Sequence, residues 1–164
     1  MPVTNNVTRL LDSRKIPYTA YELPAPAGKL GALEAAHLLN VEPASVFKTI
    51  VVTCEKPKKP LLVVVPGTST VDLKLLASAL GEKKVHLPTE REAEQLTGLQ
   101  AGGISPLALI NKGFRVVIDS SASSFTEIYI SGGQRGLNIK MPLAELVKLT
   151  NAHLATVSKP ESNE

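Results

Sequence analysis

The segment "SVFKTIVVTCEKPKKPLLVVVP" (residues 45–66) predicts the centre of the fold. It contains two strongly apolar runs, at about residues 47–54 and 61–66, rich in the β-branched side chains that favour strands. The basic turn "EKPKKP" joins these runs, which indicates an antiparallel hairpin.

A single cation, Lys48, lies near the start of the first apolar run. Because successive side chains of a strand alternate between its faces, Lys48 shares a face with the apolar residues Val46 and Ile50. An unpaired ammonium inside a protein costs several kcal/mol. Lys48 is therefore either a surface charge with a buried stem or a charge aimed at a ligand, and this segment alone leaves both interpretations open.

The rest of the chain mixes helical and extended patterns without regular alternation. Helices are expected over residues 5–14, 30–40, 71–81 and 89–98 and after Pro142. Strands are expected over residues 18–23, 83–87, 114–119, 126–130 and 137–141. Since at least two strand pairs are expected to be antiparallel, we predict an α+β fold with a mixed, largely antiparallel, barrel-like sheet flanked by helices.

Several helix ends carry capping signals. Asn5 is placed to cap the first helix, and Gly81 suits a left-handed C-terminal cap. Thr89 precedes Glu92 by three residues, which is the spacing of a capping box. Pro142 is expected to occupy the first position of the last helix.

The composition predicts one globular domain over residues 1–164, with an ordered core at about 5–157 and a polar, frayed tail from Ser158. Hydrophobic residues make up 43% of the chain and charged residues 20%, which argues against disorder. The net charge of +3 permits contact with a polyanion without arguing for it. With three Tyr, three Phe and no Trp, a surface that grips many stacked bases is not expected.

No apolar run approaches the roughly 20 residues of a membrane span. The N-terminus "MPVTNNVTRL" lacks a basic segment followed by an apolar one, so no secretory signal is expected. We therefore expect a cytoplasmic protein with no membrane contact.

The residues that usually carry metal or nucleophilic chemistry are sparse. His37, His86 and His153 lie far apart with no partner at ligand spacing, so neither a metal nor another cofactor is expected. Cys54, the single cysteine, lies in an apolar strand and is expected to act as a small hydrophobe. Ser105 lies in "GGISP", which fits a tight turn better than a nucleophile elbow.

The sequence contains two glycine clusters, "GGISP" (102–106) and "SGGQRG" (131–136). Neither matches the nucleotide-phosphate motifs G-x-x-x-x-G-K-[ST] and G-x-G-x-x-G. They are either ordinary turns or places where backbone N–H groups approach a ligand. Two such loops facing one pocket would form an oxyanion hole. Arg135, in the second loop, is either a solvated turn residue or a fork for a phosphate or carboxylate.

Taken together and in order, "SVFKTIVV", "VDLKLLASALGEKKV", "GGISPL" and "IYISGGQRGLNI" strongly resemble the YbaK family, from about residue 5 to 157. These are free-standing aminoacyl-tRNA deacylases related to the editing domain of bacterial prolyl-tRNA synthetases. "FKT", "GGISPL" and "SGGQRG" resemble the Cys-tRNA(Pro) deacylase branch most. The resemblance implies a mixed, barrel-like sheet with flanking helices, and hydrolytic removal of cysteine from Cys-tRNA(Pro) beside a transiently bound prolyl-tRNA synthetase.

The resemblance also implies site residues. It assigns Lys48 to the terminal adenosine phosphate or the ester end of the substrate, and Gly102 and Gly103 to the catalytic turn. The implied substrate-binding residues are Tyr21, Leu30, Thr49, Ile104, Ser105, Ser131, Gly132, Gly133, Arg135 and Asn138. Some relatives carry an acidic residue where this chain has Asn138, and an amide cannot act as a carboxylate base.

An aminoacyl ester is already activated, so positioning and carbonyl polarisation by the N–H of Gly102 or Gly103 would suffice. For a cysteinyl ester, the resemblance implies attack by the substrate's own thiol, which would make the enzyme a lyase. Candidate phosphate contacts are Lys56, Lys58, Lys59, Lys83 and Lys84, although each is as readily a solvated lysine. The alternatives are a deacylase for Ala- or Ser-tRNA, with residues 24–31 lining the acyl pocket, and a non-catalytic module that binds tRNA or the synthetase.

Overall fold

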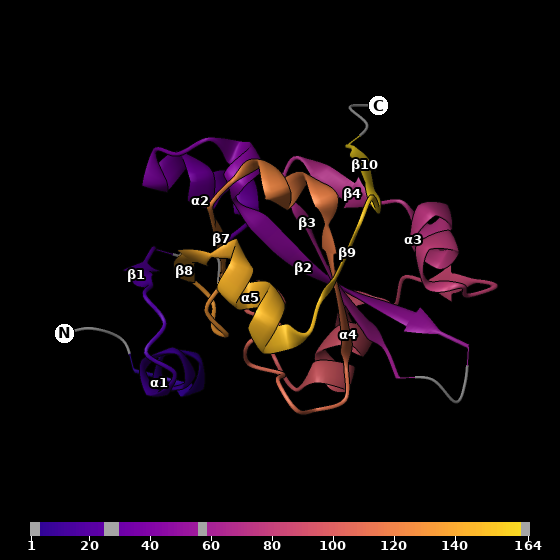
Figure 1. Ribbon diagram of the computed structural model, residues 1–164, viewed down its shortest axis with the longest axis horizontal. Helices are drawn as coiled ribbons and strands as arrows, with labels where there is room; N and C mark the ends of the chain where they lie inside the picture. The colour runs from indigo at the N-terminus through magenta and orange to yellow at the C-terminus, as the bar shows by residue number, and fades with distance from the viewer. Residues whose placement is uncertain (1–3, 25–29, 56–58, 162–164) are drawn as a thin grey trace.

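The predicted hairpin forms the middle of a five-stranded mixed sheet, shown near the centre of Figure 1. The computed structural model describes residues 4–24, 30–55 and 59–161. The sheet has the order β5-β2-β3-β6-β9. Its strands are β2 (Phe47–Cys54), β3 (Leu61–Pro66), β5 (Val85–His86), β6 (Arg115–Asp119) and β9 (His153–Ala155). β2 pairs antiparallel with β3 and β5, whereas β3–β6 and β6–β9 are parallel, so the predicted mixed sheet is confirmed.

A second, antiparallel sheet has the order β1-β8-β7. It consists of β1 (Thr19–Glu22), β7 (Glu127–Ser131) and β8 (Leu137–Pro142). The two sheets meet where Val46, just before β2, forms an isolated parallel bridge with Tyr129. This bridge places the glycine loop between β7 and β8 on the same side of the molecule as the start of β2.

The helices begin and end close to the predicted positions. They are α1 (Asn6–Ser13), α2 (Ala32–Leu39), α3 (Leu73–Leu80), α4 (Glu90–Thr97) and α5 (Leu143–Thr150), with short 3-10 turns η1 (Pro43–Ser45) and η2 (Ser120–Ser124). Asn5 caps α1, Gly81 ends α3 in the left-handed conformation, and Thr89 and Glu92 form a capping box on α4, as predicted. Among the helices of the described ranges, none is long and apolar enough to cross a membrane.

Two local predictions at the C-terminal end are wrong. Pro142 is the N-cap of α5 and not its first helical residue, because its ψ of 133° is still extended and it ends β8. The tail from Ser158 is not frayed as far as Pro160, since β10 (Ser158–Pro160) pairs with β4 (Ser69–Val71). The fully buried Val157 anchors this pairing.

The core lies on both faces of the central sheet. All six residues of β3 are buried, which explains its uninterrupted apolar sequence. Leu62 and Val64 belong to the cluster under α1 and α5, whereas Val63 and Val65 belong to the cluster beside α3. β2 is therefore held against a strand that the core fixes from both sides.

Asp119, at the end of β6, fastens the returning chain to the sheet. Asp119 is 2% exposed, and its two carboxylate oxygens accept from the N–H of Val157 at 2.9 Å and from the N–H of Ser121 at 3.2 Å. Burial alone would raise the pKa of Asp119. Hydrogen bonds from Ser121, Val157 and Ser158 outweigh that effect and lower the pKa below its ordinary value.

We predict that Asp119→Asn lowers the free energy of unfolding at pH 7 by about 1–3 kcal/mol, because at least one buried donor loses its acceptor. A lowered folded pKa stabilises the protein above the unfolded pKa of about 3.9, and this contribution is lost as the pH falls through the folded pKa. Urea unfolding should therefore show a large difference between the variant and wild type at pH 6–7 and a shrinking one below pH about 4. The exposed Glu22 provides the control, because Glu22→Gln should leave the wild-type stability and its pH dependence nearly intact.

Candidate functional site

The candidate site lies along an open stretch of β2. β3 covers one edge of β2 from Phe47 to Val52, whereas β5 covers the other edge only at Thr53 and Cys54. Within the described ranges, the isolated bridge between Val46 and Tyr129 of β7 is the one further β-bridge near the start of β2. A cavity of about 420 Å³ is lined by residues 46–51 of this stretch.

Four other segments complete the wall of this cavity. They contribute lining residues from 30–35 at the start of α2, from 87–93 at the start of α4, from 101–104, and from 131–138. The last two segments are the predicted glycine loops and their neighbours. The fold thus brings both loops to the same cavity as Lys48, although more than 50 residues of sequence separate them from it.

Part of the predicted site lines the cavity directly. The residues that do so are Lys48, Gly102, Leu30, Thr49, Ile104, Ser131 and Asn138. Tyr21 does not line it, because its ring packs in the small cluster around Tyr129, with 6.0 Å between ring centroids. Of residues 24–31, Leu30 and Gly31 line the cavity, and 25–29 lie outside the described residues.

Lys48 is half-buried at the cavity wall. Across the described parts of the chain, it forms no ion pair and no hydrogen bond. A lysine without a carboxylate partner that borders a cavity leaves its charge available to an anionic ligand. The geometry therefore favours the ligand-facing interpretation of Lys48 over the snorkelling one.

Thr49 carries an unsatisfied polar atom. Its Oγ1 is shielded from solvent and has no hydrogen-bond partner among the described residues. Buried hydroxyl groups are nearly always hydrogen-bonded in folded proteins, and an exception often marks a functional position. Since Thr49 also lines the cavity, a bound ligand is a natural partner for this oxygen.

The adjacent glycines of the first loop have different roles. Gly102 lines the cavity with a φ of +88°, and its N–H donates to no acceptor among the described residues. The N–H of Gly103 donates to Gln100 O at 2.8 Å, so of the two glycines Gly102 has the N–H that is available to a ligand in this structure. A Cβ at Gly103 would lie 3.0 Å from the backbone of Gln134, so this glycine lets the two loops pack together.

Ser105 is fully buried and lies outside the cavity wall. Its Oγ accepts a hydrogen bond from the N–H of Leu107 at 3.2 Å, which is the arrangement of a local turn. This arrangement agrees with the interpretation of "GGISP" as a tight turn. The predicted contact between Ser105 and substrate is not seen in the arrangement of the cavity wall.

The second glycine loop supports the site from outside the cavity. Gly132 and Gly133 do not line the cavity. Gly132 leaves room for the side chain of Leu137, which would lie 2.6 Å from a Cβ at position 132. The carbonyl oxygen of Gly132 accepts a hydrogen bond from Asn5 Nδ2 at 2.9 Å. Gly133 has a φ of +94°, which completes the turn.

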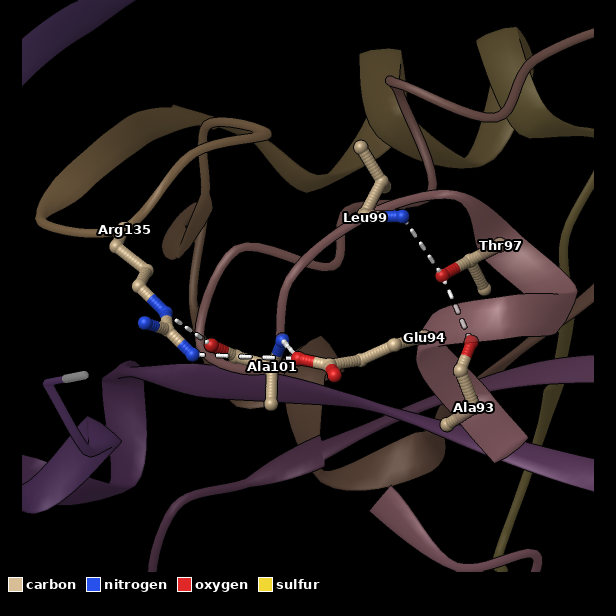
Figure 2. Close-up of polar contacts among 6 residues, drawn as sticks. All are labelled: Ala93, Glu94, Thr97, Leu99, Ala101 and Arg135. Carbon is tan, nitrogen blue, oxygen red and sulfur yellow. Dashed lines mark hydrogen bonds and ion pairs between the residues drawn. The ribbon is translucent and has the colours of Figure 1, made fainter. Parts of the chain in front are cut away.

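The guanidinium group of Arg135 binds other parts of the protein and does not face the cavity. Its Nε donates to Ala101 O at 2.8 Å, and its guanidinium lies 3.9 Å from Glu94 Oε2, as Figure 2 shows. Arg135 is also absent from the cavity wall, so the predicted direct substrate contact is replaced by a link between the two glycine loops.

The sequence analysis missed the wall formed by residues 87–93, where Leu87 is 54% exposed beside Pro88. The capping box had located the start of α4 without indicating what that helix faces. The described residues contain no group of three or more His, Cys, Asp or Glu side chains that could hold a metal ion. Cys54 lies beyond the cavity wall, with its Sγ 3.5 Å from an Arg115 nitrogen.

Known proteins share both the sequence and the architecture. The aminoacyl-tRNA editing domain family matches residues 28–149. An Enterococcus faecalis protein named "Putative Cys-tRNA(Pro)/Cys-tRNA(Cys) deacylase EbsC" is 33% identical over 156 residues, which cover 95% of this chain and 94% of that protein.

Two crystal structures extend the likeness to the whole fold. The hypothetical protein APE2540 matches with a TM-score of 0.83 and 27% identity, over 94% of this chain and all of that one. A protein described as "a putative trans-editing enzyme for prolyl tRNA synthetase" matches with a TM-score of 0.78 and 25% identity, over 96% of this chain and 99% of that one. The chain therefore belongs to the aminoacyl-tRNA editing domain family, which is the YbaK-type family that its sequence resembles.

Proposed function

We propose that this protein is a trans-editing deacylase that removes cysteine from mischarged Cys-tRNA(Pro). The observation that carries the proposal is the cavity on the open edge of β2, which is lined by Lys48, Thr49 and Gly102. This cavity lies in a chain that belongs to the aminoacyl-tRNA editing domain family. The names of the E. faecalis relative and of the trans-editing relative support cysteine as the acyl group and proline tRNA as its carrier.

The size and lining of the cavity suit the aminoacyl end of a tRNA. A volume of about 420 Å³ lies within the range of small-molecule sites and exceeds what a cysteinyl group alone would fill. The remaining space would hold part of the terminal adenosine. The wall combines apolar residues such as Leu30 and Ile104 with the amide of Asn138, which can both donate and accept.

The three wall residues have separate tasks in the proposed reaction. The Lys48 ammonium binds the phosphate of the terminal adenosine, and it positions substrate without acting as nucleophile or base. The Thr49 hydroxyl hydrogen-bonds to the bound aminoacyl end. The N–H of Gly102, which has no acceptor in the described part of the chain, polarises the ester carbonyl, and such a donor is typically worth about 3–4 kcal/mol in the transition state.

The cysteinyl substrate supplies its own nucleophile. Its thiol sulfur attacks the ester carbonyl carbon, a carbon–sulfur bond forms, and the carbon–oxygen bond to the ribose breaks. The proton lost by the thiol passes, directly or through water, to the departing ribose oxygen, so the products are a cyclic thiolactone and free tRNA. No covalent enzyme intermediate is required, and Asn138 does not need to act as a carboxylate base.

Exposed lysines mark a route for the acceptor stem. Lys59 lies just before β3, and Lys83 and Lys84 lie just before β5, which pairs with the last residues of β2. At about 3.3 Å per residue, the end of β2 is roughly 20 Å from Lys48. We propose that these lysines contact tRNA phosphates and that prolyl-tRNA synthetase is a transient partner. Lys56 and Lys58 lie outside the described residues.

We predict that purified protein releases cysteine from Cys-tRNA(Pro) and spares Pro-tRNA(Pro), and that Lys48→Ala lowers kcat/KM by about 100-fold. The physical reason is the loss of the charge that holds the terminal phosphate. Release of labelled amino acid from Cys-, Ala-, Ser- and Pro-tRNA(Pro) measures both claims.

The controls for this experiment are Lys74→Ala, which removes an exposed lysine on α3, and Cys54→Ser. Both should retain activity within about threefold, as expected for changes outside the cavity. Preferential release of alanine or serine would show that one of these, and not cysteine, is the acyl group removed. No release from any tRNA would favour a non-catalytic module that binds tRNA or the synthetase. Full activity in Lys48→Ala would remove Lys48 from the site.

Thr49→Val provides a test in which activity and stability move in different directions. The change replaces a shielded hydroxyl that lacks a partner with a methyl group of the same shape. We predict that the free energy of unfolding stays the same or rises by up to about 1 kcal/mol, whereas kcat/KM falls about tenfold because the substrate loses a hydrogen bond. Urea unfolding and the deacylation assay measure the two effects. A variant that is less stable and equally active would show that the hydroxyl serves the fold.

A further inference from the structure

The backbone of Ala101, the residue directly before Gly102, is held on both of its polar groups. Its N–H donates to Glu94 Oε2 at 2.7 Å, and its carbonyl oxygen accepts from Arg135 Nε at 2.8 Å. The same Glu94 oxygen lies 3.9 Å from the Arg135 guanidinium. Figure 2 shows the three residues as one connected group, with Ala101 between the two charged side chains.

Glu94 is itself held in place by the capped C-terminal end of α4. Glu94 lies in the last turn of α4, where its carbonyl accepts from the N–H of the capping Gly98 at 2.8 Å. Thr97 Oγ1 accepts from Leu99 N at 3.2 Å and donates to Ala93 O at 2.9 Å, which fastens the exit from the helix.

The location of this group matters because of peptide geometry. The carbonyl of Ala101 and the N–H of Gly102 belong to one planar peptide unit, and in a trans peptide they point in opposite directions. A cation that holds the carbonyl therefore sets the direction of the N–H. It also polarises the unit, so that the N–H becomes a stronger donor.

We propose that Arg135 and Glu94 are positioning residues that orient and polarise the Ala101–Gly102 peptide, so that the Gly102 N–H faces the scissile carbonyl in the cavity. This inference rests on the deacylase function proposed above. Arg135 acts through the carbonyl of Ala101, and Glu94 acts by holding the N–H of Ala101 and attracting the guanidinium. Neither side chain touches substrate.

A purely stabilising role is a weak explanation for the group. The side chains of Arg135 and Glu94 are 29% and 35% exposed, and ion pairs at such positions contribute little to stability. Their hydrogen bonds to a backbone that is itself buried, however, are charge-assisted and directional. The arrangement is therefore better suited to fixing one peptide than to stabilising the whole domain.

The test separates kcat from KM in single-turnover and steady-state deacylation of Cys-tRNA(Pro). Arg135→Ala should lower kcat about 10- to 100-fold, as expected for a displaced oxyanion donor, and leave KM within about threefold. Glu94→Ala should lower kcat similarly. Glu94→Gln should lose less than Glu94→Ala, because the amide oxygen can still accept from the N–H of Ala101.

Two comparisons sharpen this result. The double variant Glu94→Ala/Arg135→Ala should fall no further than the more impaired single variant within about twofold, because both residues act on one peptide. Glu127→Ala breaks a comparable ion pair, with Lys140 at 3.7 Å and similar exposure, and should keep kcat within about twofold.

A readout without tRNA keeps the test decisive if a variant is unstable or the substrate differs. In nitrogen-15-labelled protein, Glu94→Ala should accelerate amide hydrogen exchange at Ala101, whereas Glu127→Ala should not. Unchanged kcat in Arg135→Ala, a raised KM with retained kcat, or unchanged exchange at Ala101 would each overturn the inference. Wild-type protein without activity on any mischarged tRNA would instead refute the proposed function, and the exchange measurement would still test whether Glu94 holds this peptide.

Discussion

The site depends on the fact that β2 is fixed along one edge and open along part of the other. β3 is buried on both faces and pairs with β2 from Phe47 to Val52, so β2 cannot shift without disturbing both core clusters. β5 covers the opposite edge only at Thr53 and Cys54. Open strand edges usually need protection by other parts of a protein. Here helices and glycine loops enclose the edge without filling it, and the cavity is the space that remains.

Local signals explain why much of the fold could be predicted. The hairpin at 47–66, the N-cap at Asn5 and the capping box at Thr89 depend on residues close together in sequence, and each occurs at its predicted position. The pairing of β10 with β4 could not be predicted in this way, because three-residue strands carry little pattern of their own. The hydrogen bond from the N–H of Val157 to the buried carboxylate of Asp119 could not be predicted either, because 38 residues of sequence separate the two partners.

The candidate site shows the same limit in a sharper form. The resemblance assigned Gly102 and Gly103 together, but one glycine faces the cavity with a positive φ and the other permits a close backbone approach. Arg135 belongs to a glycine loop that reaches the cavity. Its own partners, however, are the carbonyl of Ala101, 34 residues away, and the carboxylate of Glu94 on α4. Sequence patterns identify the loops that approach a site, whereas the direction of each donor depends on contacts between distant segments.

In the proposed site, Lys48 and Thr49 would prepare the cavity for a ligand without a catalytic triad. The shielded hydroxyl of Thr49, which has no partner among the described residues, lowers the stability of the free protein. The half-buried Lys48 beside it has no partner among these residues either. A ligand that satisfied both groups would recover this free energy on binding. Because the two residues are consecutive in a strand, their side chains leave opposite faces of β2 while both border the cavity. A ligand lying along the open edge can therefore reach both, whereas one lying over a single face of the sheet cannot.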